Sequence, residues 1–289
     1  MANVLGSGEH RYEVVPSWPQ MPKYWAFGGP SDAAVNSAGE VHVFSRGDHP
    51  LTVWDAAGNF ITSWGEGTVH AKGSHGIFIT PDDHVWLSDM YQHVVTEHLP
   101  SGETVRELGM RMMPSPEWDG RPFNMPTGIA SSPTGEVFVS DGYGSHRVHR
   151  FSPAGELQHS WGEPGSGPGQ FALLHNVGVD SRGRVFICDR EANRIQIFDR
   201  DGNYLDQWTG FRGPADLWIA GETIYVSEQF DGAGVSILTL DGDLIASWRG
   251  DKGPGKGTIK SGHGICADSD GSIYVTDLGA DRVQKFARV

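Results

Sequence analysis

Hydrophobic and polar residues alternate with a period of two in six short segments that resemble one another, among them GEVHVFS, GEVFVSD and GSIYVTD. These segments end at Ser45, Asp89, Asp141, Asp189, Glu228 and Asp277, spaced by 44, 52, 48, 39 and 49 residues. Such alternation is typical of β-strands with one buried face. The spacing predicts six copies of one strand-rich unit.

Further strands flank each of these segments. A short apolar strand such as GIASSP precedes it, and a third strand such as RIQIFDRDG follows it. A fourth strand closes most units on a tryptophan: Trp64, Trp161, Trp208 or Trp248. Six four-stranded units predict an all-β fold, a six-bladed β-propeller.

The two ends of the chain complement each other. The last unit stops after its third strand, RVQKFARV, whereas the N-terminal YEVVPSW has the tryptophan-ending pattern of a fourth strand. We therefore expect one domain, residues 1–289, in which residues 12–18 complete the blade begun by 263–289 and protect its edge. Longer inserts at 109–126, 163–174 and 250–262 join a fourth strand to the next first strand, and we expect the first and third to cover the channel mouth.

Composition narrows the possible partners. The 289 residues carry 22 Lys plus Arg against 36 Asp plus Glu, a formal charge of −14. This acidic balance disfavours nucleic acids and anionic membranes, which need clustered basic residues. The sequence has neither a membrane-spanning apolar run nor a signal-peptide pattern, so we expect a cytoplasmic protein. Cys188 and Cys266, the two cysteines, are too few for a disulfide framework, and we expect both to be buried thiols.

Three histidines share one position of the repeat. His75, His175 and His263 each lie 14 residues before the acid that ends their second strand, in the second, fourth and sixth units. The same offset in the other units gives Ser31, Thr127 and Pro214. Alternate blades of a six-bladed propeller would direct the imidazoles to the central channel, where three nitrogens with an open position suit a catalytic zinc ion. The alternative is that each histidine only hydrogen-bonds to the backbone.

Polar residues just past the second strands belong to the same predicted face. Arg46, Tyr143 and Arg190 occupy these positions. A guanidinium can hold a substrate carboxylate, and a phenol can transfer a proton. For Arg190, an ion pair with a neighbouring acid is an equally good interpretation.

Six motifs together resemble a known family of NHL-repeat propellers, the lyase domain of peptidylglycine α-amidating enzymes. They are FSRGDH, GSHGI, VFVSDGYGSHRV, WGEPGSGPGQF followed by LLHNV, CDREANRIQIF, and GHGI. The resemblance runs along nearly the whole chain. It implies three zinc ligands, His75, His175 and His263, a catalytic tyrosine, Tyr143, and two arginines near the substrate, Arg46 and Arg190.

The family's reaction splits a carbinolamide into an amide and glyoxylate. A zinc ion acting as a Lewis acid with a tyrosine base would serve this chemistry, and an arginine can hold the adjacent carboxylate. Two positions depart from the animal members. Gly264 stands where they have an acid that helps bind a structural calcium, so calcium is doubtful here. Gly144 follows Tyr143, and the disulfides of those members are absent, so we expect a small-molecule substrate, carboxylate-bearing in the simplest case, rather than a peptide hormone.

Three functions remain open on the sequence. The first is a zinc-dependent lyase acting on a small α-hydroxyglycine-like substrate. The second is a hydrolase or hydratase that uses metal-bound water, and zinc, iron and manganese are all candidate metals. The third is a non-catalytic NHL interaction platform. Neither the substrate nor the oligomeric state follows from the sequence.

Overall fold

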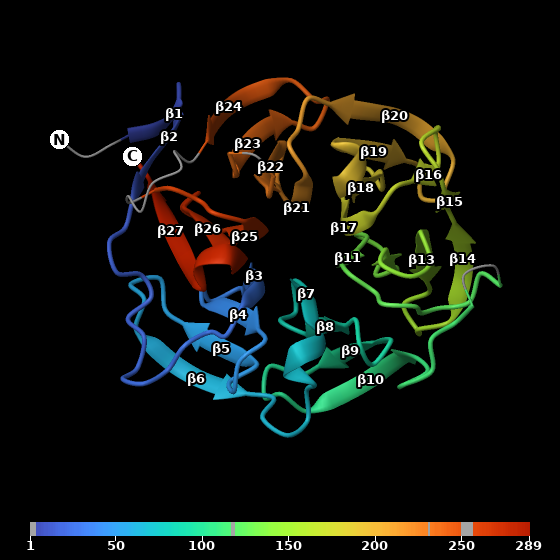
Figure 1. The fold of residues 1–289 in the computed structure, drawn as a ribbon, viewed down its shortest axis with the longest axis horizontal. Coiled ribbons are helices and arrows are strands. Elements are labelled where there is room, and N and C mark those ends of the chain that lie inside the picture. The colour runs from blue at the N-terminus through green and yellow to red at the C-terminus, as the bar shows by residue number, and fades with distance from the viewer. Residues whose placement is uncertain (1–3, 117–118, 231, 250–256) are drawn as a thin grey trace. The chain divides into compact units, whose positions relative to one another are not determined.

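The computed structural model describes residues 4–116, 119–230, 232–249 and 257–289. Within these residues the chain forms six antiparallel sheets of four or five strands, which we call blades 1 to 6, and a two-stranded parallel sheet (Figure 1). Parts of two predicted inserts, residues 117–118 and 250–256, lie outside the described residues. Each four-stranded repeat that the sequence predicts therefore corresponds to one sheet.

The first three blades follow the sequence order. Blade 1 comprises β3 (Pro30–Val35), β4 (Val41–Ser45), β5 (Leu51–Trp54) and β6 (Phe60–Trp64). Blade 2 comprises β7 (Ser74–Ile79), β8 (Val85–Asp89), β9 (Val94–His98) and β10 (Thr104–Gly109). Blade 3 comprises β11 (Ile129–Ser131), β12 (Val137–Asp141), β13 (Arg147–Phe151) and β14 (Leu157–Trp161).

The remaining blades repeat this order. Blade 4 comprises β17 (Leu174–Val179), β18 (Val185–Asp189), β19 (Arg194–Phe198) and β20 (Tyr204–Thr209). Blade 5 comprises β21 (Pro214–Ala220), β22 (Thr223–Glu228), β23 (Gly234–Thr239) and β24 (Leu244–Arg249). Blade 6 contains β25 (Gly262–Ala267), β26 (Ile273–Asp277) and β27 (Arg282–Arg288). The parallel pair is β15 (Glu163–Pro164) and β16 (Gln170–Phe171), and the 3-10 turns are η1 (Ala71–Gly73), η2 (Arg190–Ala192) and η3 (Leu278–Ala280).

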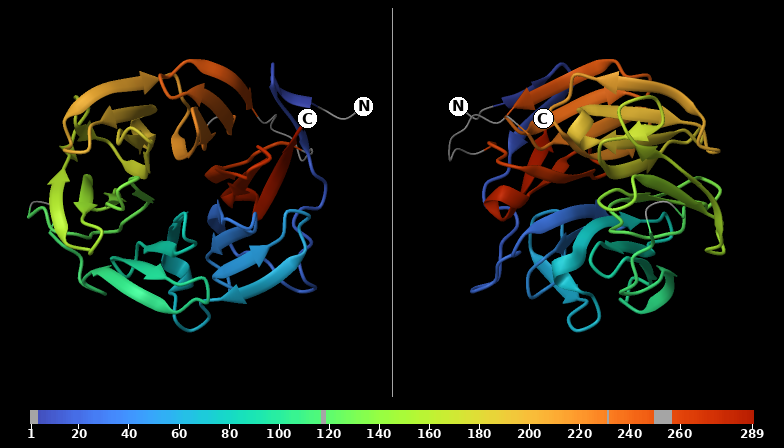
Figure 2. Two further views of the ribbon diagram at one scale, coloured as in Figure 1. Left: turned by 180° about the vertical axis from the view of Figure 1, so that it is seen from behind. Right: turned by 45° about the vertical axis from the view of Figure 1, so that its right-hand side comes forward.

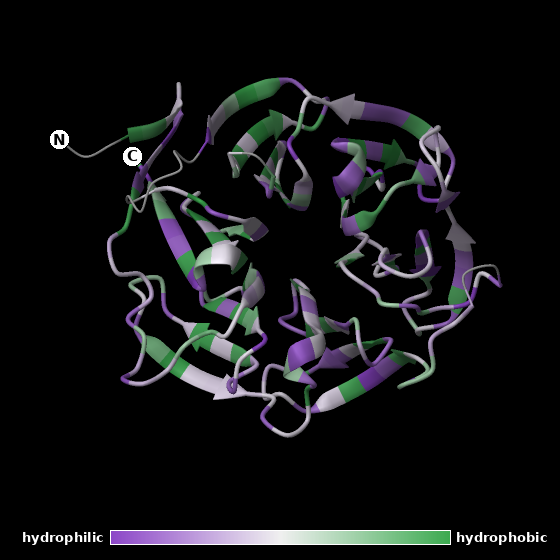
Figure 3. Cartoon of the chain, viewed as in Figure 1, coloured by the Kyte–Doolittle hydropathy of each residue, from purple (hydrophilic) through white to green (hydrophobic). Residues whose placement is uncertain are grey.

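The predicted ends of the second strands are confirmed, because β4, β8, β12, β18, β22 and β26 end at Ser45, Asp89, Asp141, Asp189, Glu228 and Asp277. The fourth strands β6, β14, β20 and β24 contain the predicted tryptophans. Second strands such as β12 are buried along their whole length, whereas outer strands such as β14 begin with exposed residues. In Figure 3, hydrophobic and hydrophilic residues alternate along the strands, as the sequence pattern predicted.

The N-terminal segment closes blade 6, as predicted, but with different bounds. The strand that pairs with β27 is β2 (His10–Val14), and β1 (Val4–Ser7) adds a fifth strand outside it (Figure 2). The expected range 12–18 was wrong at both ends. Pro16 has no N–H to continue the ladder. Trp18 lies beyond the strand, yet it is buried. The centroid of its ring lies 4.8 Å from that of Tyr274 in β26.

The chain divides into two compact units, one up to Lys72 together with the residues from Asp216 onward, and one from Gly73 to Ala215. In the first unit, one hydrophobic cluster lies around Trp248 and Phe286 and another around Trp54 and Tyr274. In the second unit, clusters lie around Phe171 and Phe198 and around Phe123 and Phe151. Each unit thus has its own buried core.

This sheet topology is that of a six-bladed β-propeller. Cys188 and Cys266 are buried thiols, as predicted. Within the described residues no helix has both the length and the apolar character needed to cross a membrane.

A pair of buried carboxyl groups, which the sequence did not point to, joins three blades of the first unit. Asp216 of β21 accepts the N–H groups of Leu217 at 2.7 Å and of Ile265 in β25 at 2.6 Å. It also hydrogen-bonds to Asp32 of β3, whose side chain accepts the N–H of Ala33 at 2.8 Å. Burial and the charge of Asp32 together raise the pKa of Asp216 well above its ordinary value.

We expect Asp32→Asn to stabilise the protein at neutral pH. The folded protein holds a proton on Asp216, whereas the unfolded chain releases this proton near pH 3.8. The free energy of unfolding therefore falls as the pH rises from 3.8 through the raised pKa of Asp216. An asparagine at position 32 would donate to Asp216 and remove the repulsion between the carboxylates. Tm at pH 7 should rise by about 2 °C, equivalent to about 1 kcal/mol.

Thermal unfolding between pH 4 and pH 8 tests this. The decline of Tm with pH should be shallower in Asp32→Asn than in the parent. Asp270→Asn, which alters an exposed carboxyl of the same unit, should leave the slope unchanged. An equal slope in Asp32→Asn and the parent would contradict the prediction.

Candidate functional site

The three predicted metal-binding histidines occupy equivalent places in the structure. His75, His175 and His263 are each the second residue of the first strand of their blade, in β7, β17 and β25. All three side chains are buried. They are a group that could hold a metal ion, with one atom from each residue.

Each of these histidines hydrogen-bonds to the following blade through the same ring nitrogen. Nδ1 lies 3.1 Å from the Thr127 carbonyl in His75, 2.7 Å from the Ala215 carbonyl in His175, and 2.6 Å from the Ser31 carbonyl in His263. A carbonyl can only accept, so Nδ1 carries the proton in each ring. The lone pair is therefore on Nε2, which is the tautomer of a metal-binding histidine whose other nitrogen donates to a carbonyl.

Buried acids hold the chain just before two of the histidines. In blade 4, Asp189 accepts the N–H groups of Ala172 and Leu173, both at 3.0 Å. In blade 6, Asp277 accepts those of Lys260 at 3.0 Å and Ser261 at 2.9 Å. These segments end two residues before His175 and His263, so the acids fix the start of each histidine-bearing strand.

The carboxyl of Asp189 is also paired with a cation. Arg194 donates through Nε to this carboxylate at 2.8 Å. Burial raises the pKa of Asp189, and the two N–H donors and Arg194 oppose that rise. The acids at these second-strand ends thus act as caps of the incoming segments.

Four of the six predicted site residues meet within the second unit. The rings of His75 and His175 lie 4.7 Å apart between centroids. The hydroxyl of Tyr143 donates to Nε2 of His75 at 3.1 Å, and its ring lies edge-on to His175 at 5.9 Å. The guanidinium of Arg190 lies 5.9 Å from the centre of the Tyr143 ring. A phenol therefore adjoins the two imidazoles, and a guanidinium lies against that phenol.

Arg190 also forms the ion pair with a neighbouring acid that was its alternative interpretation. Its guanidinium pairs with Glu191 at 2.7 Å, and its N–H donates to the Leu173 carbonyl at 3.0 Å. The side chain is buried while Glu191 is more exposed. The ion pair and the contact with Tyr143 coexist.

The other two predicted residues belong to the first unit. Arg46 follows β4, and its N–H donates to the Gly29 carbonyl at 3.0 Å. This is the end of blade 1 at which the Ser31 carbonyl accepts the proton of His263. Arg46 thus lies at the end of blade 1 to which His263 is hydrogen-bonded.

The packing of two glycines beside Tyr143, Gly142 and Gly144, was not predicted from the sequence, where Gly144 was only a departure from the family. A Cβ on Gly142 would lie 1.6 Å from the Leu174 carbonyl oxygen, and one on Gly144 would lie 2.4 Å from the side chain of Asn124. The turn that carries Tyr143 therefore lies against the backbone next to His175 on one side and against Asn124 on the other. The spacing Gly-Tyr-Gly was the available signal.

The NHL-repeat family model matches residues 123–151 and 263–286. These segments fall in blades 3 and 6. The match thus identifies NHL repeats in two blades of the propeller.

Known relatives match over most of the chain. It is 27% identical to peptidyl-glycine alpha-amidating monooxygenase of Mus musculus over 97% of its own length, although it spans only 32% of that protein. It is 29% identical to NHL repeat-containing protein 3 of Homo sapiens, covering 95% of this chain and 84% of that protein. It is 26% identical to peptidyl-alpha-hydroxyglycine alpha-amidating lyase 1 of Drosophila melanogaster, covering 82% and 48%. The predicted family resemblance is therefore confirmed.

Solved structures share the fold. Virginiamycin B lyase from Staphylococcus aureus aligns with a TM-score of 0.64 at 17% identity, covering 91% of this chain and 96% of that one. A gluconolactonase from Xanthomonas campestris aligns with a TM-score of 0.65 at 14% identity, covering 97% and 90%. Identities this low establish the propeller fold alone.

We expect Gly142→Ala to destabilise the second unit and to move Tyr143 away from His75. The added methyl would meet the Leu174 carbonyl oxygen at 1.6 Å, and overpacking of this kind costs about 1–3 kcal/mol. Gly167→Ala is the control, because its methyl would meet only the mobile end of the Gln170 side chain at 3.1 Å. Denaturant unfolding should show a lower midpoint for Gly142→Ala alone, and equal midpoints for the two variants would contradict the prediction.

Proposed function

We propose that this protein is a metal-dependent lyase that cleaves a carbinolamide into an amide and glyoxylate. Relatives named as α-amidating lyases support lyase activity at the level of the family. The observation that carries the proposal is the contact of Tyr143 with His75, beside His175 and within the same unit as Arg190. A phenol that can transfer a proton thus adjoins imidazoles of the metal-binding tautomer, with a guanidinium against its ring.

The residues present fit a transition-metal ion. We propose that Nε2 atoms of His75, His175 and His263 bind it, since imidazole suits zinc, iron and other divalent transition metals. On His75 the ion would take the lone pair to which the Tyr143 hydroxyl donates here, which would leave that hydroxyl for the substrate. Zinc is the first candidate. When bound, such an ion supplies a Lewis acid for the substrate hydroxyl. The three backbone carbonyls that accept from Nδ1 would keep each ring oriented and raise its basicity.

The reaction requires one net proton transfer. The C–N bond of the carbinolamide breaks, the hydroxyl oxygen loses its proton and becomes the aldehyde oxygen of glyoxylate, and the amide nitrogen gains a proton. No water is consumed. Tyr143 can relay this proton, because a neutral phenol can give its own proton to the amide nitrogen as it takes that of the substrate hydroxyl. Arg190, and Arg46 if it faces the same site, would hold the carboxylate of the substrate.

Metal content per chain tests the first part of the proposal. Protein purified without added metal should contain about one transition-metal ion, and His75→Ala, His175→Ala and His263→Ala should each bind it at least about tenfold more weakly. His98→Ala is the matched control, because His98 is also buried and its Nδ1 also bonds a carbonyl, that of Gly102 at 3.2 Å.

Two other results would change the assignment. Loss of metal in His75→Ala and His175→Ala but not in His263→Ala would restrict the site to the second unit. A parent protein that remains metal-free after incubation with zinc would contradict the metal site and favour an interaction platform.

Cleavage of N-benzoyl-α-hydroxyglycine tests the reaction. The metal-loaded parent should release benzamide and glyoxylate in equal amounts, and Tyr143→Phe should lower kcat by about 10²–10⁴-fold with unchanged metal content. Tyr91→Phe is the control, because Tyr91 is exposed and belongs to the same unit. Incorporation of ¹⁸O from labelled water into a primary product, measured before aldehyde exchange, would replace the lyase by a hydrolase or hydratase.

A further inference from the structure

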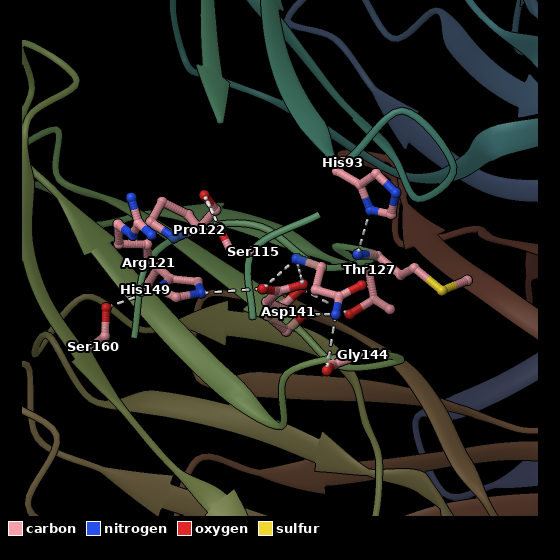
Figure 4. A network of polar contacts seen from close by, with 12 residues as sticks. His93, Ser115, Arg121, Pro122, Thr127, Asp141, Gly144, His149 and Ser160 are labelled. Atoms are coloured by element: carbon pink, nitrogen blue, oxygen red, sulfur yellow. Dashed lines mark hydrogen bonds and ion pairs between the residues drawn. The ribbon is translucent and has the colours of Figure 1, made fainter. Parts of the chain in front are cut away.

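One residue of the loop before blade 3 bonds to both sides of Tyr143. The backbone N–H of Asn124 donates to the two carboxylate oxygens of Asp141 at 2.9 and 2.8 Å. The Nδ2 of Asn124 donates to the Gly144 carbonyl at 3.3 Å. Figure 4 labels Asp141 and Gly144, the two residues to which Asn124 donates. Asn124 therefore spans the turn of which Tyr143 is the centre.

Contacts remote from Tyr143 hold Asn124 in place. The preceding residue, Phe123, is fully buried. The centroid of its ring lies 5.5 Å from that of His149 and 5.8 Å from that of Phe151. The following residue, Met125, donates its N–H to Nδ1 of His93 at 3.1 Å. Burial lowers the pKa of His93, which favours the neutral ring that this bond requires. These contacts hold Asn124 independently of its bonds to the Tyr143 turn.

A buried chain of hydrogen bonds holds the carboxylate that Asn124 binds. His149 lies 3.3 Å from Asp141 through Nε2 and 2.7 Å from the Ser160 hydroxyl through Nδ1 (Figure 4). The side chains of Asp141 and His149 are fully buried. Because each member bonds to a neighbour on another strand, Asp141 has little freedom to move.

Comparison with the other blades separates the general architecture from what is particular to Tyr143. In blades 4 and 6 the equivalent N–H groups, those of Ala172 and Lys260, also donate to the second-strand acid. The backbone bond of Asn124 is therefore part of the repeat. Its side-chain bond has no counterpart in blade 4, where alanine occupies the equivalent place. This side-chain bond occurs in the blade that carries Tyr143.

We propose that Asn124 is a positioning residue that holds Tyr143 against His75 through the Gly144 carbonyl. The inference rests on the proposed function, because it assigns Asn124 a role in the reaction through Tyr143. The phenol is half-buried and makes a 3.1 Å hydrogen bond to Nε2 of His75. A displacement of about 1 Å at such a group can lower a rate about 10²-fold. Gly144 is required at this point because a side chain there would displace Asn124.

Asn124→Ala is the informative variant, because it keeps the backbone bond to Asp141 and reproduces the residue found in blade 4. It should fold, with Tm lowered by no more than about 4 °C. With metal loaded and N-benzoyl-α-hydroxyglycine as substrate, kcat should fall about tenfold to a hundredfold, with KM and metal content little changed. Asn203→Ala, which removes a side-chain amide bonded to Asp199 in an exposed turn, should match the parent. An unchanged kcat in Asn124→Ala would overturn the proposal.

A second measurement needs neither metal nor substrate. In metal-free protein labelled with ¹³C at tyrosine Cζ, the Tyr143 resonance is assigned by its loss in Tyr143→Phe. In Asn124→Ala this resonance should move toward that of Tyr24, whose side chain is 91% exposed. An unmoved resonance would refute the positioning role. A moved resonance in a protein that fails to cleave the substrate would uphold the positioning role and reject the lyase.

Discussion

A buried carboxyl group at the end of the second strand fixes the segment that enters each of three blades. Asp141, Asp189 and Asp277 accept N–H groups from residues 16 or 17 positions earlier in the chain. Backbone N–H groups at the start of a strand otherwise have no ladder partner, so burying them requires such an acceptor. Because the acid is rigid, the residue that begins the first strand is held accurately, whatever its side chain. The scaffold and the candidate site therefore depend on the same contact.

The alternation of histidines along the repeat has a physical reason in this arrangement. Each imidazole donates from Nδ1 to a carbonyl at the start of the following blade, at Thr127, Ala215 or Ser31. Blades that donate thus alternate with blades that accept. The alternative interpretation of the sequence, histidines bonded to the backbone, is therefore realised through one nitrogen of each ring, and it leaves the tautomer that metal binding needs. The two interpretations are compatible rather than exclusive.

The sequence predicted the parts of the structure that repeat and missed those that do not. Strand alternation and spacing fixed the six blades, and counting from the acids found His75, His175 and His263. Asn124 lies in an insert without any period, so its contacts with Asp141 and Gly144 could not be predicted. Asp32 and Asp216 lie 13 and 12 residues before the ends of their second strands. Register shifts of this kind, such as the one in β3 between Pro30 and Asp32, conceal the pairing from a count of positions.

The surroundings of Tyr143 weigh against a purely structural role for this side chain. A tyrosine that only fills a core needs neighbours with side chains of their own, whereas Tyr143 lies between Gly142 and Gly144, whose missing side chains allow backbone and Asn124 to approach closely. Two glycines increase the conformational entropy lost on folding. The hydroxyl is directed at an imidazole nitrogen rather than at a carbonyl that would simply satisfy it. The turn thus places one phenol beside His75, which is the position that the proposed transfer of a proton requires.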